Sequence, residues 1–448
     1  MEETTMMLAD FIHNLKYEDL PVEVIEKAKD LILDQFGVQL ACSTKPWSQA
    51  TYRLVKEWGG KAESTVVNYG DKIPAVNAAF ANGAFGHGFE IDDSLRRATI
   101  HPGSVVVSAA LSMGERERIS GTHFILAVVI GFEVLGRIAL ATAPKLMVRG
   151  HHPTCTIGTF AAAAMTSKIL NFDRVTLINA LSIAGGYSSG LVVSGGGGDL
   201  KRIYGGLAAS GGIKAALLAE KGITGPSDVL EGRLGFCHAF SDSVRLEEVT
   251  AELGKVYRLM EIRYKYHAAD GHVHPMIDAA ADIAREHKID PDNIAEILIG
   301  TNKYIASRSI VSVSHPRDAI TAQFSGAFSV ALRLIKGSNG LNDYTDENFQ
   351  NPRITNLASK AKVVIDDEVE RDFPRVRAAT VTIRMKDGSL YSKKAEDLRM
   401  LSREERENKF RSLSTVVISP AKAEQLLKIT RGMEGVTDVS SLSKLLIP

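Results

Sequence analysis

The spacing of apolar residues changes character once along this chain, close to Tyr264. Before that point, one segment after another repeats apolar residues at helical spacing, with Gly or Pro between segments. The stretch from Ile25 to Phe36 is typical, because its apolar positions recur every three or four residues among charged ones. Helical patterns are predicted at 48–58, 74–89, 103–118, 121–142, 158–170 and 174–184, with a further patterned segment at 246–260.

After Tyr264 the sequence mixes strand and helix signals. Branched apolar residues at 296–301, 363–365 and 378–385 predict short strands, and Asp387-Gly388 predicts a hairpin turn after the last of them. Helical patterns at 274–287 and 321–335 lie between the strands, and helices return after a possible capping box of Ser402 and Glu405. The predicted fold is mainly α, with a large all-helical domain (1–264, completed by 396–448) and a smaller α+β lid domain (265–395).

Composition excludes several classes of function. The 448 residues carry 53 Lys plus Arg and 53 Asp plus Glu, so there is no overall basic field for nucleic acid or an anionic membrane. Cys42, Cys155 and Cys237 are far apart and form no Cys-x-x-Cys pair, which favours a reducing cytosolic or organellar setting and argues against an iron–sulfur cluster; we expect a cytoplasmic protein. We expect neither a secretory signal nor a membrane span, because the N-terminus is acidic and Glu133 interrupts the most apolar stretch.

A run of four glycines, 195–198, precedes Lys201 and a helix rich in small residues. Such a run costs chain entropy on folding, so it indicates a need for backbone freedom or close approach. The spacing is not that of a phosphate-binding loop. The loop therefore either delivers Lys201 to a site or is a mobile surface loop with a solvated lysine.

The stretch HGFEIDDSLRRATIHP concentrates histidines, carboxylates and arginines. His87 and Glu90 lie one helical turn apart, and Asp92, Asp93 or His101 could complete a metal site, although no diagnostic metal motif is present. The same residues could instead be capping carboxylates at a helix end, or a proton-transfer site.

Two further clusters contain histidine. His151 and His152 are adjacent at a predicted helix start; neighbouring side chains on an extended backbone point apart, so we favour His152 as the one that faces a pocket. The second cluster follows Tyr264 at the predicted domain junction, where clefts commonly bind ligands. This second cluster contains Lys265, His267, His272 and His274, and Tyr304 and Arg308 could line the same crevice. Both histidine clusters could instead be ordinary surface or linker.

Taken in order, these segments resemble the MmgE/PrpD family, which includes 2-methylcitrate dehydratases, cis-aconitate decarboxylases and iminodisuccinate epimerases. The resemblance covers nearly the whole chain. It is most specific in HGFEIDDS with ATIHP, GHHPTCTIGTFAAAA, DLKRIYGGLAASGGIKAALLAEKGITGPSDVLEGRLGF and KYHAADGHVHPMIDAA.

The resemblance implies a large helical domain, a smaller α+β lid domain, a homodimer, and catalysis without a metal or organic cofactor. It implies a small di- or tricarboxylate as the partner, and neither nucleic acid nor membrane. The implied catalytic residues are His101, His152, Lys201, Lys265 and Tyr304. The implied substrate-binding residues are Glu90, Asp92, Asp93, Ser94, Asp270 and His274.

Several positions depart from the family pattern. Glu90 and Ser94 stand where the family commonly has aspartate and threonine. Tyr204 stands where histidine is frequent, and Asp270 stands where the decarboxylases carry histidine. These departures do not change the expected fold, but they prevent the assignment of one specific substrate from the family pattern.

We therefore expect a cofactor-independent lyase for a small di- or tricarboxylic acid, with dehydration of a 2-methylcitrate-like hydroxy acid as the leading reaction. Cis-aconitate-type decarboxylation and iminodisuccinate-type epimerisation are alternatives. A non-catalytic carboxylate-binding relative and a metallohydrolase are alternatives of other classes. In the lyase, the histidines would transfer protons, and two neighbouring lysines would lower each other's pKa.

Overall fold

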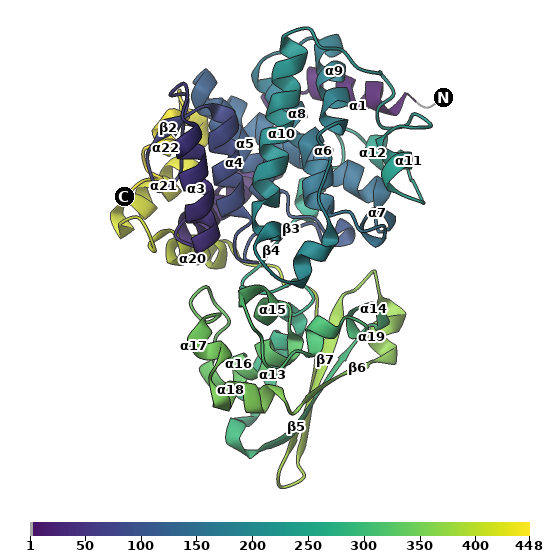
Figure 1. Ribbon diagram of the computed structural model, residues 1–448, viewed down its shortest axis with the longest axis vertical. Helices are drawn as coiled ribbons and strands as arrows, with labels where there is room; N and C mark the ends of the chain where they lie inside the picture. Colours follow the sequence, from purple (N-terminus) through teal and green to yellow (C-terminus); the bar gives the residue numbers. More distant parts are fainter. Residues whose placement is uncertain (1–2) are drawn as a thin grey trace.

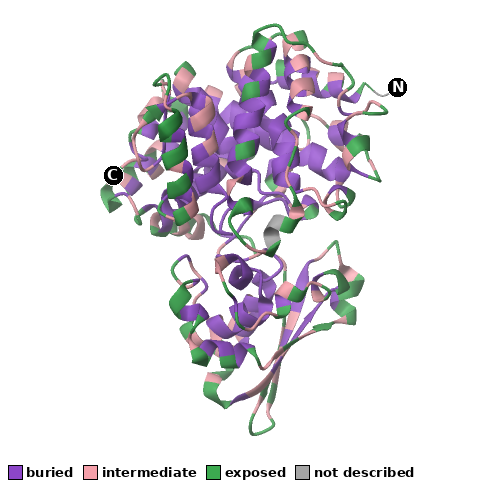
Figure 2. Ribbon diagram, in the orientation of Figure 1, coloured by how far each residue is buried: buried purple, intermediate pink, exposed green. Residues whose placement is uncertain are grey.

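Two separate hydrophobic cores organise the chain in the computed structural model, which describes residues 3–448. One core lies in a large helical body (residues 3–264 and 397–448), and the other lies mainly in a smaller domain (residues 265–396); Figures 1 and 2 show the two domains. The second core also includes buried residues of the body that face the small domain's side of the molecule, namely Val38, Ala41, Cys42, Phe89, Ile91 and Leu413. The expected mainly α fold, with a large helical part and a smaller α+β part, is confirmed.

The body contains most of the helices. They are α1 (Thr4–Asn14), α2 (Val22–Cys42), α3 (Pro46–Trp58), α4 (Ala75–Gly86), α5 (Gly103–Glu117), α6 (Gly121–Thr142), α7 (Lys145–Val148), α8 (Pro153–Ile169), α9 (Arg174–Gly185), α10 (Tyr204–Glu220), α11 (Phe236–Phe240), α12 (Glu247–Thr250), α20 (Arg403–Ser414), α21 (Pro420–Arg431) and α22 (Ser440–Ser443). It also contains two antiparallel pairs of two-residue strands, β1 (Ser64–Thr65) with β2 (Lys72–Ile73) and β3 (Asp93–Ser94) with β4 (Arg263–Tyr264), which the all-helical prediction did not include.

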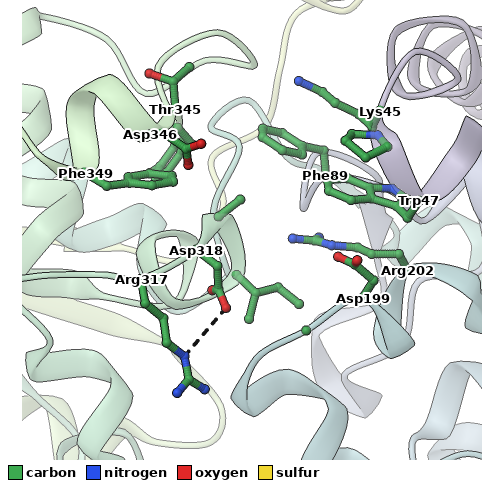
Figure 3. A pocket seen from close by; sticks show the side chains of 15 residues that line it. Lys45, Trp47, Phe89, Asp199, Arg202, Arg317, Asp318, Thr345, Asp346 and Phe349 are labelled. Atoms are coloured by element: carbon green, nitrogen blue, oxygen red, sulfur yellow. Dashed lines mark ion pairs between the residues drawn. The ribbon is translucent and has the colours of Figure 1, made fainter.

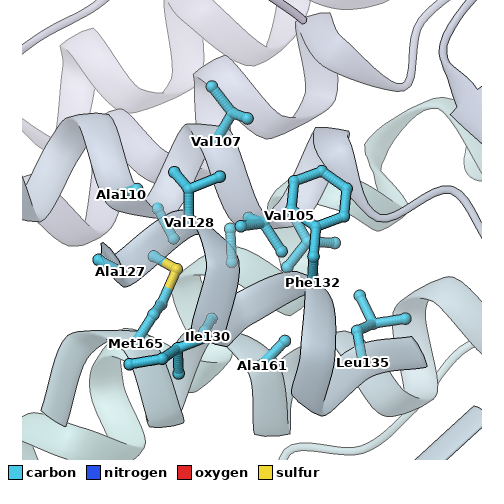
Figure 4. Packing of buried hydrophobic residues seen from close by; sticks show 14 of the residues in the cluster. Val105, Val107, Ala110, Ala127, Val128, Ile130, Phe132, Leu135, Ala161 and Met165 are labelled. Atoms are coloured by element: carbon cyan, nitrogen blue, oxygen red, sulfur yellow. The ribbon is translucent and has the colours of Figure 1, made fainter. Parts of the chain in front are cut away.

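Helices α5, α6 and α8 form the centre of the body, where branched and small side chains such as Val105, Phe132 and Met165 interlock (Figure 4). Helix α6 is long and apolar enough to cross a membrane, with a mean hydropathy of 2.2 over its most apolar window. All of that window is buried within the protein. The apolarity of α6 is therefore accounted for by its central place in the core.

Helices α4 and α10 lie in unusually close contact. A Cβ atom added to Gly206 would lie 2.0 Å from the Phe80 carbonyl oxygen, and one added to Gly83 would lie 2.7 Å from the Gly206 backbone. The small residues that follow Lys201 in sequence therefore serve helix packing. This contact brings the start of α10 to the end of α4, where the polar stretch beginning at His87 starts.

The small domain is a four-stranded sheet with helices packed against it. The strand order is β6 (Ala361–Ile365), β5 (Ile294–Thr301), β7 (Ala378–Met385), β8 (Leu390–Glu396); the β5–β6 pair is parallel and the other pairs are antiparallel. The predicted turn at Asp387-Gly388 connects β7 to β8, with Gly388 at a φ of 91°. Its helices are α13 (His274–His287), α14 (Lys303–Ala306), α15 (Ala319–Gln323), α16 (Gly326–Lys336), α17 (Asp346–Phe349), α18 (Pro352–Ala358) and α19 (Asp367–Asp372).

After β8 the chain returns to the body. The predicted capping box is present, because the Ser402 side chain accepts from the Glu405 amide and Glu405 accepts from the Ser402 amide. Helix α20 packs along α2, with Phe410 fully buried in the body core. The chain therefore passes between the two domains twice, once on each side of residues 265–396.

Three predicted helices are wrong in part. The helix predicted at 74–89 ends at Gly86, because the next residues include Glu90 in a left-handed conformation (φ 55°). The helix predicted at 321–335 is interrupted between α15 and α16, where Ser325 caps the second helix. Most of 246–260 is not helical, because Glu252 and Gly254 have positive φ angles of 51° and 75°.

Replacing Gly206 with alanine is expected to destabilise the body. The added Cβ would meet the backbone of α4, which cannot move aside as a flexible side chain can. Overpacking of this kind costs about 1–3 kcal/mol, so the thermal unfolding midpoint should fall by several degrees. Gly435→Ala is the matched control, because a Cβ there meets nothing within 4 Å. Equal midpoints for the two variants would contradict this account of the contact between α4 and α10.

Candidate active site

Three segments distant in sequence meet where the helical body faces the small domain. They are the irregular stretch 87–93 after α4, the 3-10 turn η4 (Leu200–Ile203) before α10, and Lys265 directly after β4. The ladder between β3 and β4 places Asp93 opposite Tyr264, so Lys265 lies beside the carboxylates of the first segment. Backbone pairing thereby joins residues that are more than 170 positions apart.

Glu90 is the centre of this group. Its Oε1 forms a short ion pair with Lys201 and lies 3.5 Å from Arg202 Nη1, and its Oε2 lies 2.9 Å from Lys265 Nζ. Glu90 is 1% exposed. Burial alone would raise the pKa of its carboxyl, but the two lysines and Arg202 hold that pKa well below its usual value. Glu90 is therefore ionised in the folded protein.

Asp92 connects Lys265 to a histidine. Its Oδ2 lies 2.7 Å from His87 Nδ1, and its Oδ1 lies 3.5 Å from Lys265 Nζ. Burial opposes ionisation of Asp92, but the nearby histidines and Lys265 lower its pKa. An ionised carboxylate only accepts hydrogen bonds, so His87 Nδ1 carries the proton. Among residues 3–448, His87 Nε2 has no hydrogen-bond partner, which leaves a buried nitrogen lone pair.

His101 is oriented by the backbone of Asp93. Its Nδ1 lies 2.8 Å from the Asp93 carbonyl oxygen, which can only accept, so Nε2 is the unprotonated nitrogen. Burial, with Lys265 next in weight, lowers the pKa of His101 to about 3. The Asp93 carboxyl itself accepts from the Gly103 amide at 2.9 Å and does not contact the lysines. Burial and Asp92 raise its pKa to about 8.

The two adjacent histidines point apart, as expected from their spacing. His152 is 8% exposed, its ring lies 4.8 Å from the Tyr204 ring and 5.8 Å from the His87 ring, and burial holds its pKa well below the usual value. His151 packs instead against Phe240, at 4.8 Å between ring centres. His152 is thus the member of the pair that joins the cluster.

The two lysines are not equivalent. Burial, only partly offset by Glu90, lowers the pKa of Lys201. Burial also acts on Lys265, but Glu90 and Asp92 outweigh it and raise the pKa of Lys265. The expectation that both lysines would have lowered pKa values is therefore wrong for Lys265, because it lies between two ionised carboxylates.

This arrangement has chemical consequences. Lys201, Arg202 and Lys265 are three buried cations that face two ionised carboxylates, Glu90 and Asp92, while the neighbouring imidazoles are neutral. The surplus positive charge favours an anionic ligand. The lysines can hold carboxylates, and the bare imidazole nitrogens can accept protons.

Four predicted site residues lie outside this network of contacts. Tyr304, on α14 of the small domain, is 39% exposed, and its ring lies 6.4 Å from the His272 ring. Asp270 accepts from the His272 amide, and His274 packs against the Tyr266 and His267 rings. Ser94 is buried in β3, opposite Arg263. The roles expected for these four residues stay predictions.

Sequence reasoning missed Arg202 and Gln323. Arg202 is 1% exposed, and its Nη2 donates to Gln323 Oε1 at 2.7 Å. Adjacency to Lys201 in DLKR was the available signal for Arg202, because consecutive residues of a tight turn can both face inward. Nothing in the sequence pointed to Gln323, which comes from the other domain.

In the part of the chain that the structure describes, neither a reactive cysteine nor a cluster of potential metal ligands is present. Cys42, Cys155 and Cys237 are all buried and unpaired, and burial raises the pKa of each thiol to about 12. Within residues 3–448, no three His, Cys, Asp or Glu side chains are arranged so that they could hold a metal ion.

A cavity of about 400 Å³ lies between the two domains next to this cluster. Figure 3 shows Lys45, Phe89 and Arg202 on the body side facing Asp318 and residues of α17 on the other. Arg202 contributes to both the cavity wall and the buried ion cluster. A change in the spacing of the domains would therefore act on Arg202 directly.

The pKa of Asp93 makes stability depend on pH in a defined direction. Its folded value of about 8 lies above the usual 3.8, so the fold favours the protonated carboxyl. This contribution is complete below pH 3.8 and is lost as the pH rises towards 8. Asp93→Asn mimics the protonated form and cannot ionise. The difference in thermal midpoint between this variant and the wild type should therefore grow in favour of the variant from pH 5 to pH 8 and stay constant at higher pH. A difference that is constant from pH 5 to pH 8 would contradict the buried, protonated state.

Comparison with known proteins shows the family. The model of the MmgE/PrpD N-terminal domain matches residues 6–249, and the model of the C-terminal domain matches residues 267–434. The C-terminal match therefore includes helices α20 and α21, which pack on the helical body.

Relatives match the chain along its length. Cis-aconitate decarboxylase of Aspergillus terreus is 28% identical over 470 residues, which cover 99% of this chain and 95% of that protein. The cis-aconitate decarboxylase-like protein oryM of Aspergillus oryzae is 28% identical, with 99% and 97% covered. Cis-aconitate decarboxylase of Homo sapiens is 26% identical, with 100% and 95% covered. Since the two family models together match most of its residues, this chain belongs to the MmgE/PrpD family.

Proposed function

We propose that this protein is a lyase that decarboxylates a small tricarboxylic acid, with cis-aconitate as the first candidate substrate. The observation that carries the proposal is the group of three buried cations and three imidazoles around Glu90 and Asp92. It occurs in a chain whose full-length relatives are named cis-aconitate decarboxylases. These names support decarboxylation over the expected dehydration of a 2-methylcitrate-like acid, for which the comparisons give no support.

Decarboxylation sets two demands on the site. The bond to the departing carboxylate breaks, its electron pair moves into the conjugated system, and a proton must then be added to carbon. Lys265 suits the role of a permanent cation for a remaining carboxylate, because its pKa is raised. Lys201 suits the role of proton donor, because its pKa is lowered. A bound carboxylate would compete with Glu90 for Lys201.

Dehydration is a second candidate, favoured by one specific observation. Removing water next to a carboxylate needs a base for a C–H proton. His87 and His101 each present an unprotonated Nε2, because each uses Nδ1 to donate to an oxygen atom. A hydroxy acid bound between these nitrogens and the lysines could lose water by the same set of groups.

The proposal is tested by incubating the purified protein with cis-aconitate and measuring carbon dioxide release and the five-carbon unsaturated dicarboxylate product. The same preparation is assayed for dehydration of 2-methylcitrate, for epimerisation of iminodisuccinate and, with a chelator present, for dependence on metal. Turnover of cis-aconitate well above the other two substrates is expected. Binding of carboxylates with no turnover of any substrate would support the non-catalytic alternative instead.

Replacing the central groups should remove activity. Lys201→Ala and His152→Ala should each lower kcat by about 10²-fold or more, since a positioned proton-transfer group typically contributes 10²–10⁴-fold. Lys428→Met, on the exposed face of α21, is the control and should retain wild-type kcat. Wild-type kcat in both site variants would place the chemistry elsewhere.

We also propose that the protein is a homodimer that covers part of α10. Leu207 and Leu218 on this helix are each 37% exposed, and Tyr187 beside it is 38% exposed. Light scattering on the purified protein should give about twice the chain mass of 48.5 kDa, and Leu218→Lys should shift it towards the single-chain mass. A single-chain mass for the wild type at micromolar concentration would reject the dimer.

A further inference from the structure

We propose that Gln323 and Lys409 are positioning residues, which hold the backbone on either side of Glu90 so that its carboxylate meets the two lysines. Neither residue touches the Lys201 or Lys265 amine in the structure. Gln323 comes from the small domain, and Lys409 comes from helix α20, which belongs to the body. The inference rests on the proposed function only for its kinetic test, because its structural consequence is measurable without turnover.

The segment that carries Glu90 needs outside support. Glu90 has a φ of 55°, a left-handed conformation that residues with a side chain rarely adopt, and it lies between α4 and β3 without regular backbone pairing. Its carboxylate must nevertheless reach Lys201 and Lys265 at the same time. Such a conformation persists where the surroundings over-determine it.

Gln323 binds the peptide group that precedes Glu90. Its Nε2 donates to the Phe89 carbonyl oxygen at 2.9 Å, and its Oε1 accepts from Arg202 at 2.7 Å. Because a guanidinium only donates and a carbonyl only accepts, the amide has one possible orientation, and both of its ends are used. Gln323 is fully buried, and its own carbonyl accepts from the Asp270 amide at 2.9 Å. The end of α15 is thus fixed to the segment that follows Lys265.

Lys409 binds the peptide group that precedes Asp92. Its Nζ donates to the Ile91 carbonyl oxygen at 2.7 Å and forms an ion pair with Asp34 of α2, also at 2.7 Å. The side chains of Lys409 and Asp34 are 8% and 2% exposed, so the pair is largely shielded from water. Each of the two ionised carboxylate residues is thus preceded by a carbonyl that a buried side chain holds from another part of the chain.

This geometry assigns a role to the small domain in building the site. Gln323 is its hydrogen-bonded connection to both Arg202 and the Glu90 segment. If the domain moved away from the body, Gln323 would release the Phe89 carbonyl and Arg202 together. The position of the Glu90 carboxylate relative to the two lysines would therefore depend on the small domain being in contact with the body.

The principal test uses Gln323→Met, which keeps the length of the side chain and removes its amide. The lysine amines are labelled with an acylating reagent at neutral pH, and labelling at each position is quantified by mass spectrometry. Loss of the connection should loosen Glu90 and raise labelling of Lys201 and Lys265 at least threefold. In the decarboxylation assay, kcat should fall at least tenfold with a smaller change in KM.

Matched variants separate positioning from folding. Gln350→Met changes an exposed glutamine of the same domain and should behave as the wild type. The double variant Asp34→Asn with Lys409→Met removes the second connection without leaving an unpaired buried charge, and it should also raise labelling of the lysines. Lys409→Arg keeps a hydrogen-bond donor and a cation, so labelling in this variant should stay at the wild-type level.

Labelling of both lysines within twofold of wild type in Gln323→Met, in protein that still unfolds cooperatively, would overturn the proposal. If the wild type turns over none of the substrates, the proposed function fails, while the labelling result still decides on the positioning role. If Gln323→Met does not fold, the same labelling criterion is applied to Gln323→Glu, which can pair with Arg202 but cannot donate to the Phe89 carbonyl when ionised.

Discussion

The structure depends on one buried ion cluster, in which Glu90 joins Lys201, Arg202 and Lys265. Charges removed from water are costly unless they are paired, and removal of one partner leaves the others uncompensated. The ion cluster is therefore stable only when all the segments that supply its charged side chains are in place. Its members come from the end of α4, the start of α10 and the crossing between the domains, so the folding of the body and the seating of the small domain both converge on it.

The surrounding fold supplies the precision that the cluster needs. The close contact of α4 with α10 at Gly206 brings the lysine turn to the carboxylates, and the short β3–β4 ladder does the same for Lys265. The contact at Gly206 and the β3–β4 ladder each involve few residues, but each fixes the position of the backbone and not only that of a flexible side chain. The groups around the site are thereby differentiated: Lys201 and Lys265 have pKa values shifted in opposite directions, although both amines meet the same carboxylate.

The family resemblance and the geometry contribute different kinds of knowledge. The resemblance of HGFEIDDS, HHPT, DLKR and KYH to family motifs identified most of the residues that converge on Glu90, and the family models show the membership. It did not show that Asp93 contacts His101 through its backbone carbonyl, or that Tyr304 is 39% exposed and lies outside the contacts of the two lysines. Those facts concern orientation, which a motif does not specify.

Local sequence determined the helices with strong periodicity, such as α6, as well as the hairpin at Gly388 and the capping box at Ser402, because spacing and turn chemistry act within a few residues. It also determined that His151 and His152 point apart. Only the tertiary structure decided which charges meet. The left-handed Glu90, the contribution of Arg202, and the contacts of Gln323 and Lys409 with its flanking carbonyls depend on segments up to 318 residues apart, and no local pattern encodes such a distance.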